Sequence, residues 1–313
     1  MEETRPDLLD PMTYTTQKLL IRDNTLDDAQ LTTRCPLDNG RHTDASILTR
    51  HSVGQLDQLP AELLIQVLLY NDIPSLTVFR RVNRRAMELV DSVPQYAAII
   101  RAILAVEADA FDCRVLYRTL STSRCSTCSL FGDFLYLIDC RRVCYFCFTE
   151  RPEYFSLTIG RASRLLTPDP TRPRVTRRQL LREANPPSIL SLPGRYCAPW
   201  NGDGGKLARK PLQLFDRRAL IQDLEGSGLP NDDKFDREPL RFMAIITAPY
   251  LFDSGRQADW GYFCLGCSEE CDEETTDFRM KYLREEVLEH MVRYGPVREV
   301  PEELDTFMHV NQV

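Results

Sequence analysis

Residues 59–69, LPAELLIQVLL, form an almost continuous apolar run near the start of the chain. On a wheel of about 3.6 residues per turn, their apolar side chains point nearly all the way round the axis. Only Glu62 and Gln66 mark a polar stripe. A helix of this kind must be covered on nearly every side, by a large core, a membrane or another protein.

The polar breaks around this run predict three short helices within residues 54–95. Pro60 suits the first turn of the first helix, where its missing N–H costs nothing, and Asn71 marks the end of that helix. Ser75 is the predicted N-cap of the second helix, and RRAMELVDSV forms the third. Further amphipathic helices are predicted over residues 96–120.

The remaining pattern predicts an α+β fold of short elements. The aromatic run FGDFLYLID at 131–139 suits a strand. RFMAIITAPY at 241–250 and ADWGYFC at 258–264 predict a β-hairpin, and FRMKYLREEVLEHMVR at 278–293 predicts a C-terminal helix.

Composition divides the chain into six predicted segments. They are 1–53, a disordered N-terminal segment; 54–95, the three-helix unit; 96–158, helices followed by a Cys-rich region; 159–236, a Pro-, Arg- and Gly-rich linker with one short helix around 177–183; 237–295, a β-hairpin with a second Cys group and a helix; and 296–313, an acidic, frayed tail.

The overall charge and the apolar runs narrow the class of protein. The 313 residues carry a net charge of -7, so the whole chain is not built to collect phosphate backbones. The longest apolar stretch begins at Tyr96, is interrupted by Arg101, and is far shorter than the roughly 20 residues that cross a bilayer. The first residues lack the order of a signal peptide. We therefore expect no membrane contact and a cytoplasmic or nuclear location, where cysteines stay reduced.

Eleven cysteines in such a chain favour metal binding over a disulfide framework. Cys125 and Cys128, then Cys144 and Cys147, form CxxC twice with a short predicted strand between them. This spacing is typical of a zinc ribbon, since two tight turns bring four thiolates to one ion. Cys140 is a possible substitute for one ligand. The alternatives are reduced structural cysteines or, less favoured, a redox pair.

A second group near the C-terminus contains Cys264, Cys267 and Cys271. The next ligand type along the chain is His290, on the predicted C-terminal helix, which completes a closed set of three cysteines and one histidine. We predict structural zinc at both groups. A crossed arrangement, in which the CxxC pairs share sites, stays open.

Several enzyme motifs are absent from the sequence. No HExxH, GxSxG or GxGxxG occurs, and GDGGK near residue 204 lacks the flanking residues of a phosphate-binding loop. A RING-type ligase needs a histidine among its cysteines, yet none lies between His51 and His290. We therefore predict that the chain is not an enzyme.

The stretch LPAELLIQVLLYNDIPSLTVFRRVNRRA resembles an F-box, with its Leu-Pro-x-Glu start and its Asp-x-Pro-Ser-Leu break. The wider order is similar to fungal F-box proteins in which CxxC, an aromatic strand and CRRVCxxC follow the box, and LPGRY and RFMAI…WG…CxGC come later. The resemblance covers residues 56–267. Asn71 departs from it, since this family more often has Leu there.

This resemblance implies that the box binds the Skp adaptor of a cullin-RING ubiquitin ligase while the rest of the chain selects a protein substrate. A unit of about 45 residues buries too little surface to cover an all-round apolar helix by itself. The side chains expected to contact the adaptor are Leu59, Pro60, Leu63, Leu64, Val67, Leu68, Ile73, Pro74, Leu76 and Val82.

Other interpretations compete with the adaptor. The Leu-rich helices also suit the core of a larger helical domain. A zinc-stabilised nucleic-acid-binding or general protein-interaction protein is the main alternative; its support is Arg161, Arg164, Arg172, Arg174, Arg177, Arg178 and Arg182. The acidic balance and the few aromatic residues among those arginines oppose nucleic acid as a partner. A zinc enzyme needs an open coordination position, which a closed set of cysteines does not offer.

Overall fold

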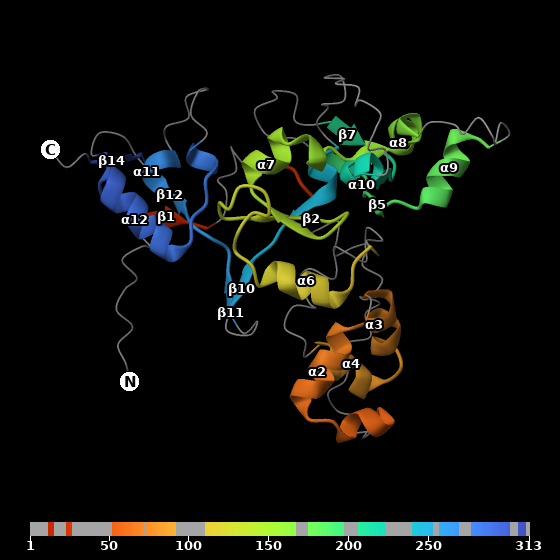
Figure 1. Cartoon of the computed structure of the whole chain (residues 1–313). Helices are drawn as coiled ribbons and strands as arrows, with labels where there is room; N and C mark the ends of the chain where they lie inside the picture. Colours follow the sequence, from red (N-terminus) through yellow and green to blue (C-terminus); the bar gives the residue numbers. More distant parts are fainter. Residues whose placement is uncertain are drawn as a thin grey trace.

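A computed structural model of the chain describes residues 12–15, 23–26, 52–71, 73–91, 110–166, 175–196, 206–222, 240–252, 257–268, 277–300 and 306–310. Its helices and small antiparallel sheets give the mixed α+β fold that the sequence predicts. In Figure 1 a helical unit lies at one end of the molecule, and the sheets gather around strand β2 (Phe134–Tyr136) at the other.

The helical unit contains α2 (Ala61–Leu69), α3 (Ile73–Arg80) and α4 (Arg84–Asp91), preceded by the 3-10 turn η1 (Gly54–Gln58). The three predicted helices are confirmed, but the predicted N-cap at Ser75 is wrong, because α3 already begins at Ile73. Proline is tolerated in a first turn, so Pro74 does not delay this helix. Asn83 caps α4, since its Oδ1 accepts the Ala86 N–H at 2.8 Å.

Helix α6 (Cys113–Leu120) joins the helical unit to the main sheet. It begins at Asp112, whose carboxylate accepts the Val115 N–H at 2.8 Å. It packs against α2 on one side and against β3 (Arg141–Val143) on the other. In Figure 1 it lies between α2 and β2. The helix prediction for 96–120 holds over this range, and residues 96–109 lie outside the described residues.

The main sheet has the order β3-β2-β9, with β2 (Phe134–Tyr136) between β3 (Arg141–Val143) and β9 (Ile245–Thr247). The strand predicted in FGDFLYLID is therefore confirmed. All three side chains of β2 are buried, because apolar layers cover both faces of this central strand. Strand β9 comes more than a hundred residues after β2 in the chain, so the sheet links distant parts of the sequence.

A buried arginine on β3 ties this sheet to its surroundings. The Arg142 guanidinium donates to the carbonyls of Thr119 (3.1 Å), Ala248 (3.2 Å) and Pro249 (2.5 Å), and also to that of Gly132. A Cβ atom on Gly132 would lie 2.5 Å from Arg142 Cγ, so only glycine fits there. Burial lowers the pKa of Arg142 to about 10, which leaves it charged at neutral pH.

The segment predicted as a linker, 159–236, is folded over its described ranges. It contributes α8 (Ile159–Leu165), α9 (Arg177–Ala184), β5 (Ser188–Leu190), β6 (Gly194–Tyr196), β7 (Lys206–Ala208), β8 (Gln213–Phe215) and α10 (Arg217–Gln222). With β4 (Leu157–Thr158) they form a sheet of order β4-β8-β5 and a hairpin β6-β7. Only the helix around 177–183 was predicted. Strands of two or three residues carry too little periodicity to be recognised before they pair.

The C-terminal region departs from prediction in three ways. Residues 241–250 split into the turn η5 (Phe242–Ala244), strand β9 and the start of β10 (Tyr250–Phe252), which pairs with β11 (Gln257–Asp259). The predicted helix divides into η7 (Asp277–Arg279) and α12 (Arg284–Tyr294). The tail predicted as frayed contains a hairpin of β13 (Val297–Glu299) and β14 (Phe307–His309).

The prediction of a disordered N-terminal segment is also wrong for the part that the structure describes. Strand β1 (Thr13–Tyr14) pairs with β12 (Phe263–Cys264), and Tyr14 stacks on Phe263 at 5.0 Å between ring centroids. Asp23 forms a buried ion pair with Arg279 at 2.5 Å. These partners lie some 250 residues away in the sequence, so the local pattern carries no sign of them.

Replacing Arg142 tests whether this side chain holds the sheet together. Arg142→Met keeps the apolar stem but leaves buried carbonyls without donors, so we expect the free energy of unfolding to fall by about 3 kcal/mol. Urea denaturation of the metal-loaded protein, followed by circular dichroism, measures the change. Arg118→Met, at an exposed position on α6, is the matched control and should stay within about 0.5 kcal/mol of the parent. Equal midpoints for Arg142→Met and the parent would contradict this role.

Candidate metal centres and apolar surface

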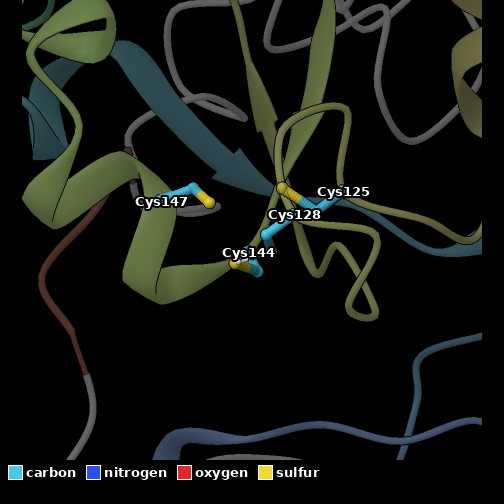
Figure 2. A group of neighbouring side chains, drawn as sticks. All are labelled: Cys125, Cys128, Cys144 and Cys147. Atoms are coloured by element: carbon cyan, nitrogen blue, oxygen red, sulfur yellow. Dashed lines mark hydrogen bonds between the residues drawn. The ribbon is translucent and has the colours of Figure 1, made fainter.

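The first centre contains Cys125, Cys128, Cys144 and Cys147, as the sequence predicts. Their ligand atoms all lie within 4.8 Å of one another, and Cys128 Sγ lies 3.4 Å from Cys144 Sγ. A tetrahedral site with Zn–S bonds of about 2.3 Å places its sulfurs about 3.8 Å apart, so this cluster fits one ion of that size. Figure 2 shows the four side chains converging from a loop and from the start of a helix.

Backbone hydrogen bonds shape both halves of this centre. In the first CxxC, the Cys125 N–H donates to the Leu130 carbonyl at 2.7 Å, and Ser129 takes a positive φ of 65° to close the turn. The second CxxC follows β3 directly. There Cys144 is the N-cap of α7 (Tyr145–Glu150), and Cys147 lies one turn along that helix.

In this centre the Cys125 thiol loses its proton more readily than those of Cys144 and Cys147. The hydrogen bond from the Cys144 side chain, with backbone donors of Thr127 and Cys128, lowers the pKa of Cys125 to about 4. Burial raises the pKa of Cys147 to about 12, and the hydrogen bond to Cys125 raises the pKa of Cys144. The Cys125 thiolate therefore forms readily, while Cys144 and Cys147 need a cation nearby to lose their protons.

Cys140 is not a member of this ligand set. It is buried, has a positive φ of 58°, and its carbonyl accepts the Thr119 hydroxyl at 2.9 Å. Burial raises the pKa of its thiol to about 12. Cys140 is thus a neutral turn residue, and its suggested role as a substitute ligand has no support in this arrangement.

The second centre contains Cys264, Cys267, His290 and His309. Cys267 Sγ lies 3.3 Å from His290 Nε2, Cys264 Sγ lies 3.3 Å from His309 Nε2, and the two Nε2 atoms are 3.2 Å apart. Tetrahedral zinc with Zn–N bonds of about 2.0–2.1 Å gives separations of about 3.3–3.6 Å, so this set also fits one ion.

His309 takes the position predicted for Cys271, which lies outside the described residues. Its Nδ1 is 2.8 Å from the Gly295 carbonyl, and an Nδ1–H donor there leaves the Nε2 lone pair free for a metal. Gly266 makes room for the ring, because a Cβ atom there would lie 2.8 Å from His309 Cδ2.

The hairpin of β13 and β14 explains why this ligand was missed. His309 follows Cys267 by some forty residues and lies in a segment that appeared acidic and frayed. The only available signal was the apolar-flanked FMHV, which suits a short strand. Val297 pairs with His309 across the hairpin, and this pairing returns the tail to the cysteines.

The electrostatics of the second centre resemble those of the first. The hydrogen bond with Cys267, followed by that with His290, lowers the pKa of Cys264 to about 4. In each centre one CxxC lies where a strand ends and a short helix begins: Cys144 and Cys147 between β3 and α7, and Cys264 and Cys267 at β12 and α11 (Leu265–Ser268).

The two centres are separate but linked. Cys264 and Cys267 lie together in the second cluster, and the two other CxxC pairs lie together in the first. The crossed arrangement therefore does not occur. Arg124, beside the first centre, forms an ion pair with Glu286 on α12, the helix that carries His290. Gly261 has a φ of 68° and abuts the buried Phe131 ring, which holds the second region against the first loop.

The residues predicted to contact a partner fall into two groups. Leu64, Leu68 and Leu76 are buried in the core of the chain, with exposures of 5%, 3% and 1%. The other group is exposed and contains Leu59, Leu63, Val67 and Val82. Together with Tyr70 and Val78, which are also exposed on the helical unit, we call these side chains the apolar face. Pro60 is exposed as well, and the side chains of Ile73 and Pro74 lie outside the described set.

Comparisons with known proteins provide no functional assignment. No protein-family model matches it, and no curated protein and no solved structure matches it either. Among the described residues, no helix is long and apolar enough to cross a membrane.

We expect two equivalents of metal, with zinc the favoured ion, in protein purified without chelators under reducing conditions. His309→Ala should remove one equivalent, because three remaining ligands hold an ion more weakly than a closed set of four. Met308→Ala, at the exposed neighbour on the same strand, is the matched control and should keep both. Elemental analysis after dialysis measures this. Two equivalents in His309→Ala would show that this histidine is not a ligand.

The first centre gives a second prediction. Cys147→Ser should release one equivalent of zinc and expose the loop around residues 125–131 to proteolysis, since thiolates gain affinity only when folded around an ion. Cys140→Ser is the control, because this cysteine is buried nearby but lies outside the ligand set. Loss of zinc from both variants, or from neither, would contradict the assignment.

Proposed function

We propose that the chain is a substrate-recognition adaptor, which binds the Skp adaptor through residues 54–91 and recruits a protein substrate to a cullin-RING ubiquitin ligase. The observation that carries the proposal is the apolar face of the helical unit. It adds a physical reason to the resemblance of this segment to an F-box.

Three members of the apolar face lie together along one helix. Leu63 and Val67 of α2 and its C-cap residue Tyr70 are spaced four and three residues apart, so they share one side of the helix. Their exposures are 49%, 42% and 62%. Contiguous apolar patches of this kind mark interaction sites on soluble proteins. Covering each such side chain contributes up to about 1.5–3 kcal/mol, which favours a helical partner.

The buried side of the same helix fixes the unit to the rest of the chain. Leu64 and Leu68 belong to the hydrophobic core that also contains Leu116 of α6. The Arg114 guanidinium lies 4.6 Å from the Tyr70 ring centroid, which adds a contact at the end of α2. A partner bound to the apolar face would thereby be held at a defined position relative to the rest of the chain.

Structural zinc would support the proposed substrate-binding part of the chain, which follows residues 54–91 and which we call the receptor region. Both ligand sets have four members of the Cys and His type, which is the composition of closed structural zinc sites. The strands around them are only two or three residues long, and sheets of this size are not stable without help. We propose that zinc holds the receptor region in shape and takes no part in catalysis.

A continuous series of contacts connects the helical unit to the first metal centre. Helix α6 contacts both α2 and β3. The Thr119 carbonyl at its end accepts from Arg142 on β3, and Cys144 follows that strand directly. This path supports an adaptor whose ligase-binding and substrate-binding parts move as one body.

The test changes the apolar face without disturbing the core. Leu63→Asp combined with Val67→Asp should abolish binding of the Skp adaptor, because two charges would be buried at the interface without partners. Gln66→Asp, an exposed change on the same helix, should bind normally. Substitutions at Leu64 or Leu68 are unsuitable, since these side chains are buried within the chain. Co-purification and calorimetric titration measure binding.

Two outcomes would contradict the proposal. One is a parent chain, with both zinc ions present, that fails to bind the Skp adaptor. The other is unchanged binding by the double variant. Equal zinc content in parent and variant shows that the receptor region has stayed folded.

A further inference from the structure

Positive charge is concentrated in one folded part of this acidic protein. We call residues 156–166, 175–196 and 206–222 the basic module. These ranges hold eleven Lys and Arg side chains against two acidic ones, a net charge of +9, whereas the whole chain carries -7. The remainder of the chain therefore carries -16. Charge segregation of this size indicates a surface for an anionic partner.

The charges of the basic module are held at fixed positions. Its sheet β4-β8-β5 has alternate side chains on two faces, since Leu214 joins the main core and Phe215 joins a smaller one with Leu157 and Leu181. Helix α8 packs against both α9 and α10. In Figure 1 the basic module lies on the opposite side of the β2 sheet from α12. A preorganised surface of this kind loses less entropy on binding than a flexible linker.

Several cations of the basic module have no acidic partner. Within the part of the chain that the structure describes, six side chains are exposed and form no ion pair: Arg164, Arg177, Arg178, Arg182, Arg209 and Lys210. On α9, Arg178 and Arg182 are one turn apart and lie beside each other on the helix surface. A capping box of Thr176 and Gln179 fixes the start of this helix.

Aliphatic side chains are exposed among these charges. Leu207, Leu212 and Ile159 have exposures of 50%, 37% and 39%. In the β6-β7 hairpin the exposed Arg195 and Leu207 are direct cross-strand partners. The two aromatic residues among the described positions of the module, Tyr196 and Phe215, are buried. The surface therefore offers guanidinium and aliphatic contacts and no aromatic platform.

We propose that the basic module is an interaction surface for an acidic protein segment that carries aliphatic residues among its Asp and Glu side chains. Guanidinium groups bind carboxylates in a bidentate manner, and the exposed Leu and Ile side chains match aliphatic groups of such a segment. That this segment belongs to the recruited substrate rests on the proposed adaptor function; the binding itself does not.

Nucleic acid fits this surface less well. Single strands gain much of their affinity by stacking bases on exposed aromatic rings, which the described residues of the module lack. Duplex DNA carries a charge about every 1.7 Å, so a duplex extending past the module meets the negative remainder of the chain. A short acidic segment avoids this repulsion.

The experiment titrates the full-length, zinc-loaded chain into a fluorescently labelled synthetic peptide of repeated Asp-Glu-Leu units. Arg178→Glu with Arg182→Glu, and separately Arg209→Glu with Lys210→Glu, should each weaken binding about tenfold, because every reversal replaces an attraction by a repulsion. Arg118→Glu with Arg298→Glu carries the same charge change at exposed sites outside the module and should leave the affinity within about twofold. Binding should also weaken as salt is added.

Other results would overturn the inference. They are no binding of the peptide by the parent at low salt, an equal loss in the control variant, tighter and equally variant-sensitive binding of duplex DNA or single-stranded RNA, or a variant-sensitive self-association that makes a second copy the partner. The peptide titration contains no Skp adaptor. Leu63→Asp with Val67→Asp should therefore bind the peptide normally, which separates failure of this inference from failure of the adaptor proposal.

Discussion

The buried guanidinium of Arg142 is the interaction on which the arrangement of this protein depends. It joins the end of α6, the loop before β2 and the chain after β9 through their carbonyl oxygens. A buried charge is costly unless its donors are satisfied, so these segments keep one relative position. Cys144 follows two residues later, and the geometry of the first metal centre is thereby tied to the same point.

The two candidate metal centres lie among sheets that are too small to be stable alone. Most strands have two or three residues, and the core is divided among three clusters of unequal size. Four ligands around an ion replace contacts that a larger sheet would provide. The ion pair between Arg124 and Glu286 and the close packing of Gly261 on Phe131 make one centre a support for the other. The two centres are thus parts of one folded region.

The exposed surfaces of the helical unit and of the basic module differ in chemistry. The helical unit exposes Leu63, Val67 and Tyr70, and the basic module exposes arginines and lysine without acidic partners. An apolar face favours a permanent, helix-packed partner, while a charged surface favours rapid and salt-sensitive recognition. This division is what the proposed adaptor function requires, since an adaptor stays bound to one partner while it exchanges another.

The sequence by itself determined the features that depend on neighbours a few residues apart: the helices α2 and α9, the strand in FGDFLYLID, and the three CxxC pairs. Tertiary structure alone decided which side of α2 is buried, because Leu63 and Leu64 have the same chemistry and differ only in their position relative to α6. It also decided that His309 completes the second centre and that the described parts of 159–222, namely 159–166, 175–196 and 206–222, fold. Pairing across tens of residues positions these groups, and the short strands involved leave almost no periodic signal in the sequence.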